Sequence, residues 1–150
     1  MEQQHFSAAF MANTHPEAAF EAINNVRGWW TENMEGNSAN LNDEFEVRFG
    51  DVHYSKQKLE TVIPGKKIVW LVTDSRLNFL EDKSEWTNTR ISFDITQRDG
   101  QTEVRFTHEG LVPAIECYGA CSNAWGYYVN SLQELITTGK GRPEPKVPAA

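Results

Sequence analysis

Apolar and polar residues alternate along most of this chain, which is the pattern of strands that bury one face. Phe45, Val47 and Phe49, for example, are separated by Glu46 and Arg48. Such alternation predicts strands at residues 6–12, 45–49, 52–62, 68–73, 87–97 and 102–108. The connections between these segments are short and include an Asp-Gly pair at 99–100, which favours a tight hairpin. We therefore expect an antiparallel sheet.

The period changes from two residues to 3.6 near both ends of the chain, where helices are expected. Near the N-terminus, Thr14 is placed to act as an N-cap and Pro16 suits the first turn of a short helix. A second short helix or turn is expected at 26–30. Near the C-terminus, a long helix is expected to open at Pro113 and end at Gly139. Its inner face would carry Ala114, Cys117, Cys121, Trp125, Tyr128, Leu132 and Leu135.

The length of 150 residues suits a single domain, which we place at residues 1–139. The segment 140–150 contains three prolines, and we expect it to be a disordered tail. The polar stretch 32–43 is expected to be a loop. Residues 74–84 are charged and irregular but include apolar side chains, so they predict either an extra short strand or a lid.

Composition and charge exclude several classes of function. The net charge of −7 argues against a protein that binds nucleic-acid backbones, because such proteins need clustered Lys and Arg. The longest apolar run, residues 68–72, is far shorter than a membrane span, and the first residues do not form a secretory signal. The two cysteines, Cys117 and Cys121, lie one helical turn apart, where a disulfide would contribute little. We therefore expect free thiols and a cytoplasmic protein.

Four motifs resemble those of one known superfamily. They are Thr-His-Pro-Glu-Ala-Ala-Phe at 14–20, Val-Arg-Gly-Trp-Trp at 26–30, Pro-Gly-Lys-Lys-Ile-Val-Trp at 64–70 and Phe-Thr-His-Glu-Gly-Leu at 106–111. The chain resembles START-like (SRPBCC, birch-pollen-allergen-like) proteins and, among them, the branch of activator-of-heat-shock-ATPase homologues (AHSA-like). The resemblance implies an α+β helix-grip fold, in which a curved antiparallel sheet surrounds a long C-terminal helix and two short helices follow strand one.

A helix gripped by a curved sheet leaves room for a cavity, and aromatic residues with a few polar groups are typical of small-molecule sites. We expect a small hydrophobic or amphipathic ligand between helix and sheet, with His53 and His108 orienting its polar end. For any single aromatic residue, however, core packing is the favoured explanation. The predicted ligand-binding residues are His53, Trp70, Phe79, Trp86, His108, Cys117, Cys121, Trp125 and Tyr128.

Two other functions fit the sequence. One is a cyclase or hydrolase acting on a hydrophobic substrate, with His108 as general base. The other is a chaperone-interacting (co-chaperone-like) module, which the superfamily also includes. We favour the non-enzymatic alternative, because the sequence has no nucleophile elbow, phosphate loop, dinucleotide fingerprint or zinc-protease motif. We expect no cofactor for the same reason.

Two further features concern metals and partners. We expect no metal site, because Cys117 and Cys121 lack the tight spacing of a structural zinc site. On the outer face of the long helix, Gly119 and Gly126 each cost about 1 kcal/mol relative to alanine. Their presence there is compatible with close approach by a second subunit, which would give a homodimer through this face. Ordinary surface variation or an irregular first turn is the alternative that we favour.

Overall fold

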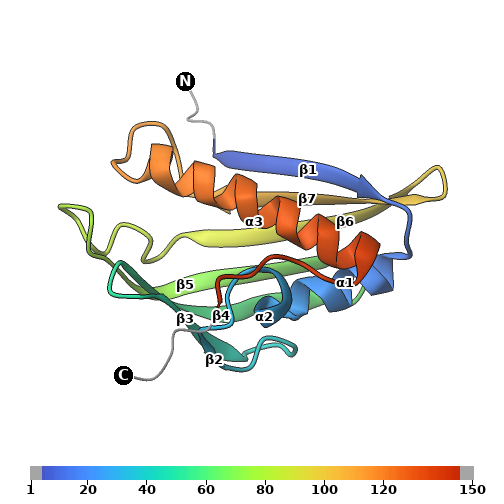
Figure 1. Ribbon diagram of the computed structural model, residues 1–150, viewed down its shortest axis with the longest axis horizontal. Helices are drawn as coiled ribbons and strands as arrows, with labels where there is room; N and C mark the ends of the chain where they lie inside the picture. The colour runs from blue at the N-terminus through green and yellow to red at the C-terminus, as the bar shows by residue number, and fades with distance from the viewer. Residues whose placement is uncertain (1–4, 146–150) are drawn as a thin grey trace.

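The computed structural model describes residues 5–145 and arranges them as one curved sheet that grips a long helix (Figure 1). The strands lie side by side, all antiparallel, in the order β1-β7-β6-β5-β4-β3-β2. Helix α3 crosses the inner face of the sheet diagonally, and α1 lies beside its last turns (Figure 1). The predicted helix-grip α+β fold is confirmed. The elements are β1 (Phe6–Ala12), α1 (Pro16–Asn24), α2 (Val26–Trp29), β2 (Met34–Gly36), β3 (Glu44–Phe49), β4 (His53–Ile63), β5 (Lys67–Leu77), β6 (Arg90–Arg98), β7 (Gln101–Glu109) and α3 (Tyr118–Thr138).

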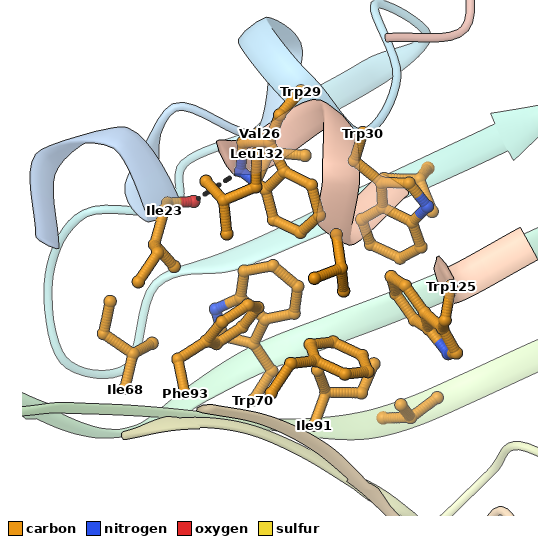
Figure 2. Close-up of a cluster of buried hydrophobic side chains, with 14 of the residues drawn as sticks. Ile23, Val26, Trp29, Trp30, Ile68, Trp70, Ile91, Phe93, Trp125 and Leu132 are labelled. Carbon is orange, nitrogen blue, oxygen red and sulfur yellow. Dashed lines mark hydrogen bonds between the residues drawn. The ribbon is translucent and has the colours of Figure 1, made fainter. Parts of the chain in front are cut away.

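Tryptophan rings fill the core between α2 and the sheet (Figure 2). Trp29 and Trp30 stack on Trp70 of β5, with ring centroids 6.3 and 5.9 Å away, and Phe93 of β6 meets Trp70 edge-on. Each of these rings is at most 2% exposed. The indole nitrogen of Trp29 donates to the carbonyl oxygen of Ile23 at 3.1 Å, so this buried N–H is satisfied. Burial of large side chains contributes about 1.5–3 kcal/mol each and fixes α2 on the sheet.

A β-bulge changes which residues of β5 face the core. Up to Val72, the even-numbered residues of this strand are buried. Beyond Thr73, the buried residues are the odd-numbered Ser75 and Leu77. The register places Lys56 of β4 opposite Asp74 and Gln57 opposite Val72, which leaves Thr73 as the extra residue. Strand β5 therefore continues to Leu77 instead of ending near residue 73 as the sequence predicted.

Two helix starts differ from the sequence prediction. Helix α3 begins at Tyr118 and not at Pro113, because the backbone between them forms turns with hydrogen bonds three residues back, at Ile115 and Tyr118. Helix α1 has His15, not Thr14, as its N-cap residue, without a side-chain cap. The carbonyl oxygen of Thr14 instead accepts a hydrogen bond from Thr102 Oγ1 at 2.6 Å, which ties the helix start to β7.

Strand β2 and the segment after α3 were both expected to be irregular. The three-residue β2 pairs with β3 and extends the sheet by one strand. Residues 140–145 pack along the α2 end of the molecule, where Glu144 exchanges backbone hydrogen bonds with Trp30 and Glu32, each of 2.9 Å. This part of the chain therefore differs from the disordered tail expected at 140–150, and residues 146–150 lie outside the described range. The expected end of α3 is confirmed, since Gly139 adopts φ 86° as its C-cap.

Gly141 is the point at which the C-terminal segment approaches the core most closely. A Cβ atom there would lie 2.5 Å from the carbonyl oxygen of Gly28 and 2.9 Å from that of Ser131. We expect Gly141→Ala to lower the free energy of unfolding by about 1–3 kcal/mol, measured by urea denaturation, because backbone would have to move.

Gly119→Ala is the control for this substitution. No atom lies within 4 Å of a Cβ at Gly119, and alanine is the better helix former, so the free energy of unfolding should rise by about 0.5–1 kcal/mol. Equal effects of the two substitutions would contradict the close packing at Gly141.

Candidate functional site

An aromatic pocket of about 200 Å³ opens between the first half of α3 and the β3–β4 hairpin. Its rim is apolar, because Val52 and Phe79 are 53% and 46% exposed. A larger hollow of about 480 Å³ lies beside β2 but is lined mostly by charged residues of both signs, which do not suit an apolar molecule. The aromatic pocket is lined by Trp30, Phe49, Val52, His53, Phe79, Trp86, Ala120, Cys121, Ala124, Trp125 and Tyr128.

The pocket includes six of the nine residues that the sequence predicted as ligand-binding, namely His53, Phe79, Trp86, Cys121, Trp125 and Tyr128. The other three, Trp70, His108 and Cys117, are fully buried behind the wall. Sequence reasoning missed Ala120 and Ala124, although they lie next to Cys121 and Trp125 on the same side of α3. Helical spacing would have indicated them if the predicted inner face had been widened by one residue. It also missed Phe49 and Val52 as wall residues, whereas Trp30 had been considered as a contributor from the short helix.

The wall is built around Trp125 of α3. Its ring lies 4.9 Å from that of Trp30 and is stacked at 5.7 Å on that of Trp86, measured between centroids. On the sheet side it packs 4.6 Å from Phe106. Trp125 is 2% exposed, so it belongs both to the core and to the pocket wall.

His108 holds Trp125 in place and does not reach the pocket. Trp125 Nε1 donates to His108 Nδ1 at 3.0 Å, so Nδ1 carries no proton and the neutral ring is protonated on Nε2. Nε2 donates to Thr89 Oγ1 at 2.8 Å, and that hydroxyl donates to the carbonyl oxygen of Trp86. Burial lowers the pKa of His108 to about 3. Both nitrogens are therefore engaged, and neither is free to take a proton from a substrate.

His53 is the polar ring within the pocket wall. The rings of Phe49, Trp86 and Trp30 surround it edge-on, with centroids 5.1, 4.7 and 6.4 Å away. Its Nε2 lies 2.9 Å from Ser55 Oγ, which in turn accepts a hydrogen bond from Gln57 Nε2 at 2.6 Å. Burial lowers the pKa of His53 to about 3, so the ring is neutral at physiological pH.

The segment that carries Phe79 and Trp86 is fastened to the start of α3 by two carboxylates. Glu85 Oε1 accepts from the backbone nitrogen of Cys117 at 2.8 Å, and Glu116 Oε1 accepts from that of Glu81 at 3.0 Å. The first of these bonds places negative charge at the N-terminus of a helix, where it is favourable. Residues 78–86 therefore form a tethered cover at one side of the pocket.

The two cysteines are joined in a disulfide. The sequence instead predicted free thiols. Because α3 begins only at Tyr118, Cys117 occupies the N-cap position, with its Cα 5.5 Å from that of Cys121. The bond places Cys121 in the pocket wall and Cys117 beneath it.

Neither a metal site nor a membrane-spanning helix is found in the described part of the chain. Among residues 5–145, no three His, Cys, Asp or Glu side chains are grouped so that they could hold a metal ion. No helix in this range combines the length and the apolar character needed to cross a membrane.

The curved sheet closed over α3 defines a protein of the START-like (SRPBCC) helix-grip class. The family described as Activator of Hsp90 ATPase homolog 1-like protein matches residues 13–137, and the chain belongs to this family. No curated protein matches the sequence.

Solved structures agree with this assignment. The Aha1 dimer from Colwellia psychrerythraea, determined in solution, is 25% identical with a TM-score of 0.73, and the match covers 92% of this chain and 99% of that one. Protein SSP2350 from Staphylococcus saprophyticus shares the fold at 13% identity and a TM-score of 0.70, covering 95% and 98% of the two chains. DynU16, described as a putative protein in the dynemicin biosynthetic locus, shares it at 13% identity and 0.69, covering 97% of this chain and 52% of DynU16.

The neutral buried histidines make the stability of the fold depend on pH. An unfolded histidine binds a proton near pH 6.5, whereas folded His108 stays neutral down to about pH 3. The unfolded state thus binds more protons in this interval, and the free energy of unfolding falls as the pH falls. We expect His108 to contribute about 1.4 kcal/mol per pH unit to this decline.

Urea denaturation between pH 4 and pH 6 measures this contribution. The variant His108→Gln keeps an acceptor for Trp125 Nε1 but cannot titrate. Its free energy of unfolding should therefore fall less steeply with falling pH, by about 1.4 kcal/mol per pH unit, than that of the unmodified protein. Parallel pH dependences for the variant and the unmodified protein would show that His108 is not held neutral by burial.

Proposed function

We propose that this protein binds a small, largely apolar molecule in the aromatic pocket, without catalysing a reaction on it. The observation that carries the proposal is a pocket of about 200 Å³ whose walls are aromatic rings and small side chains around one polar ring, His53. Clefts of this composition are the usual sites of small ligands. The exposed apolar rim at Val52 and Phe79 adds to the surface that a ligand would cover.

The arrangement around His108 supports binding over catalysis. The enzymatic alternative requires His108 as a general base within hydrogen-bond reach of a substrate. In the buried network, Trp125 and Thr89 use both of its nitrogens, and the rings of Trp86 and Trp125 pack edge-on against it. The role that fits His108 is to position Trp125.

Native mass spectrometry of the protein purified from its own host tests the proposal. We expect a co-purifying small mass that is lost on denaturation. The variant Ala124→Phe, which adds a ring at the exposed side of the pocket, should reduce the bound fraction severalfold by filling the space. Asn123→Phe, at the neighbouring exposed position outside the pocket, is the control and should retain it. A clean ligand-free mass, together with no binding of added aromatic compounds, would overturn the proposal.

We also propose that two copies pair through the outer face of α3 around Gly119 and Gly126. No atom lies within 4 Å of a Cβ built at either glycine, so this face has room for close approach of another backbone. Tyr127 beside them is 46% exposed and offers apolar surface. The Colwellia psychrerythraea relative is described as a dimer, which supports the proposal.

Sedimentation velocity of the purified protein tests the proposed pairing. Gly126→Arg should convert a dimer into monomers, because a long charged side chain would occupy the contact. Thr96→Arg, an exposed position on β6 and away from α3, is the control and should leave the dimer intact. A monomer at all concentrations, or a dimer unaffected by Gly126→Arg, would refute pairing through this face.

A further inference from the structure

The polar groups of the pocket indicate which chemical class of ligand it would bind. This inference rests on the binding function proposed above. Ser55 Oγ accepts a hydrogen bond from Gln57 Nε2 and also lies 2.9 Å from His53 Nε2. A hydroxyl has one proton to donate, and His53 Nε2 is the acceptor it reaches. Since Ser55 Oγ has no other acceptor for its proton among the described residues, we infer that it donates to Nε2 and that the neutral imidazole carries its proton on Nδ1. His53 and His108 are thus protonated on opposite nitrogens.

The Nδ1–H group of His53 is available to a ligand. It has no partner among the described residues, and it is not enclosed in the way that Trp86 Nε1 is. The two nitrogens of an imidazole point in nearly opposite directions. Nε2 is occupied by Ser55 Oγ, and the ring of His53 forms part of the pocket wall together with Phe49 and Val52.

The remaining features of the pocket restrict the charge and size of the ligand. No Asp, Glu, Lys or Arg belongs to its wall within residues 5–145, so a charged ligand would be desolvated without a counter-charge. A volume of about 200 Å³ exceeds the ~150 Å³ apolar cavity that holds benzene in another protein.

We propose that the pocket takes a small, neutral, planar aromatic molecule with a hydrogen-bond-accepting oxygen, such as an aryl ketone or aldehyde, and that this oxygen accepts from His53 Nδ1–H. The Ser55–Gln57 pair is the positioning element, because it holds the proton of His53 on Nδ1. The flat rings of Trp30, Trp86 and Trp125 provide stacking surfaces for the aromatic part.

The protonation state is tested first, without any ligand. Long-range ¹H–¹⁵N NMR spectra of the full chain at pH 7 distinguish the two neutral forms of each histidine. We expect the Nδ1–H form for His53 and the Nε2–H form for His108. Ser55→Ala should move His53 toward the Nε2–H form. The Nε2–H form at His53 in the unmodified protein would overturn the assignment.

Ligand preference is tested with two probes of the same shape, acetophenone and α-methylstyrene, which differ in a carbonyl oxygen against a methylene group. Affinities are measured by NMR titration, and the ratio of the two is compared among variants. Loss of one neutral hydrogen bond corresponds to about a fivefold change. We expect Ser55→Ala to reduce the ketone-to-hydrocarbon ratio about fivefold. We also expect benzoate not to bind.

Ser75→Ala is the matched control. Ser75 lies directly opposite Ser55 on β5 and is also buried, but its hydroxyl bonds to Thr87 Oγ1 and not to His53. This variant should leave the ratio unchanged. If both probes bind and the ratio is the same in all three proteins, the hydrogen bond to His53 is refuted while the apolar pocket stands. If neither probe binds, the proposed binding function itself fails.

Discussion

The hydrogen bond between Trp125 and His108 is the interaction on which the pocket depends. The buried indole N–H of Trp125 is satisfied by His108 Nδ1 of β7, which accepts its hydrogen bond at 3.0 Å. This bond fixes the rotation of α3 about its own axis as well as its distance from the sheet. This rotation in turn places Ala120, Ala124 and Tyr128 in the wall of the pocket beside the β3–β4 hairpin. Trp125 therefore belongs both to the hydrophobic core and to the wall of the pocket.

The sheet could be predicted from sequence wherever one face is buried along an entire strand. Strand β7 alternates regularly, and the structure buries the residues that this alternation indicated; Phe45 and Val47 of β3 are buried as well, whereas Phe49 is half-buried. The second half of β5 escaped prediction because the bulge at Thr73 interrupts the alternation without ending the strand. Strand β2 is too short to show a period, and it exists because β3 offers a free edge. The start of α3 was misplaced because Pro113, although suited to a first helical turn, belongs to a series of turns.

The sequence predicted which kinds of residue form the site, but not which of them line the pocket and which lie buried behind its wall. Cys121, Trp125 and Tyr128 were recognised because helical spacing places them on one face. His53 and His108 both face inward, and strand periodicity does not distinguish them. The structure does so because the start of β4 lies at the open end of the sheet, whereas His108 lies beneath Trp125 and Trp86. How far α3 extends over each strand is a tertiary property without a local signal.

The bulge in β5 has a consequence for how such proteins diverge. Without Thr73, Val72 would be followed by Asp74 facing outward and Ser75 facing inward, so the residues on each face would stay the same. What would change is the local twist that a bulge adds to its strand. Gain or loss of one residue at this point would therefore bend or straighten the sheet near the β3–β4 hairpin. The residues that line the aromatic pocket would stay the same. Length variation in a strand can thus reshape a pocket while every side chain that lines it is inherited unchanged.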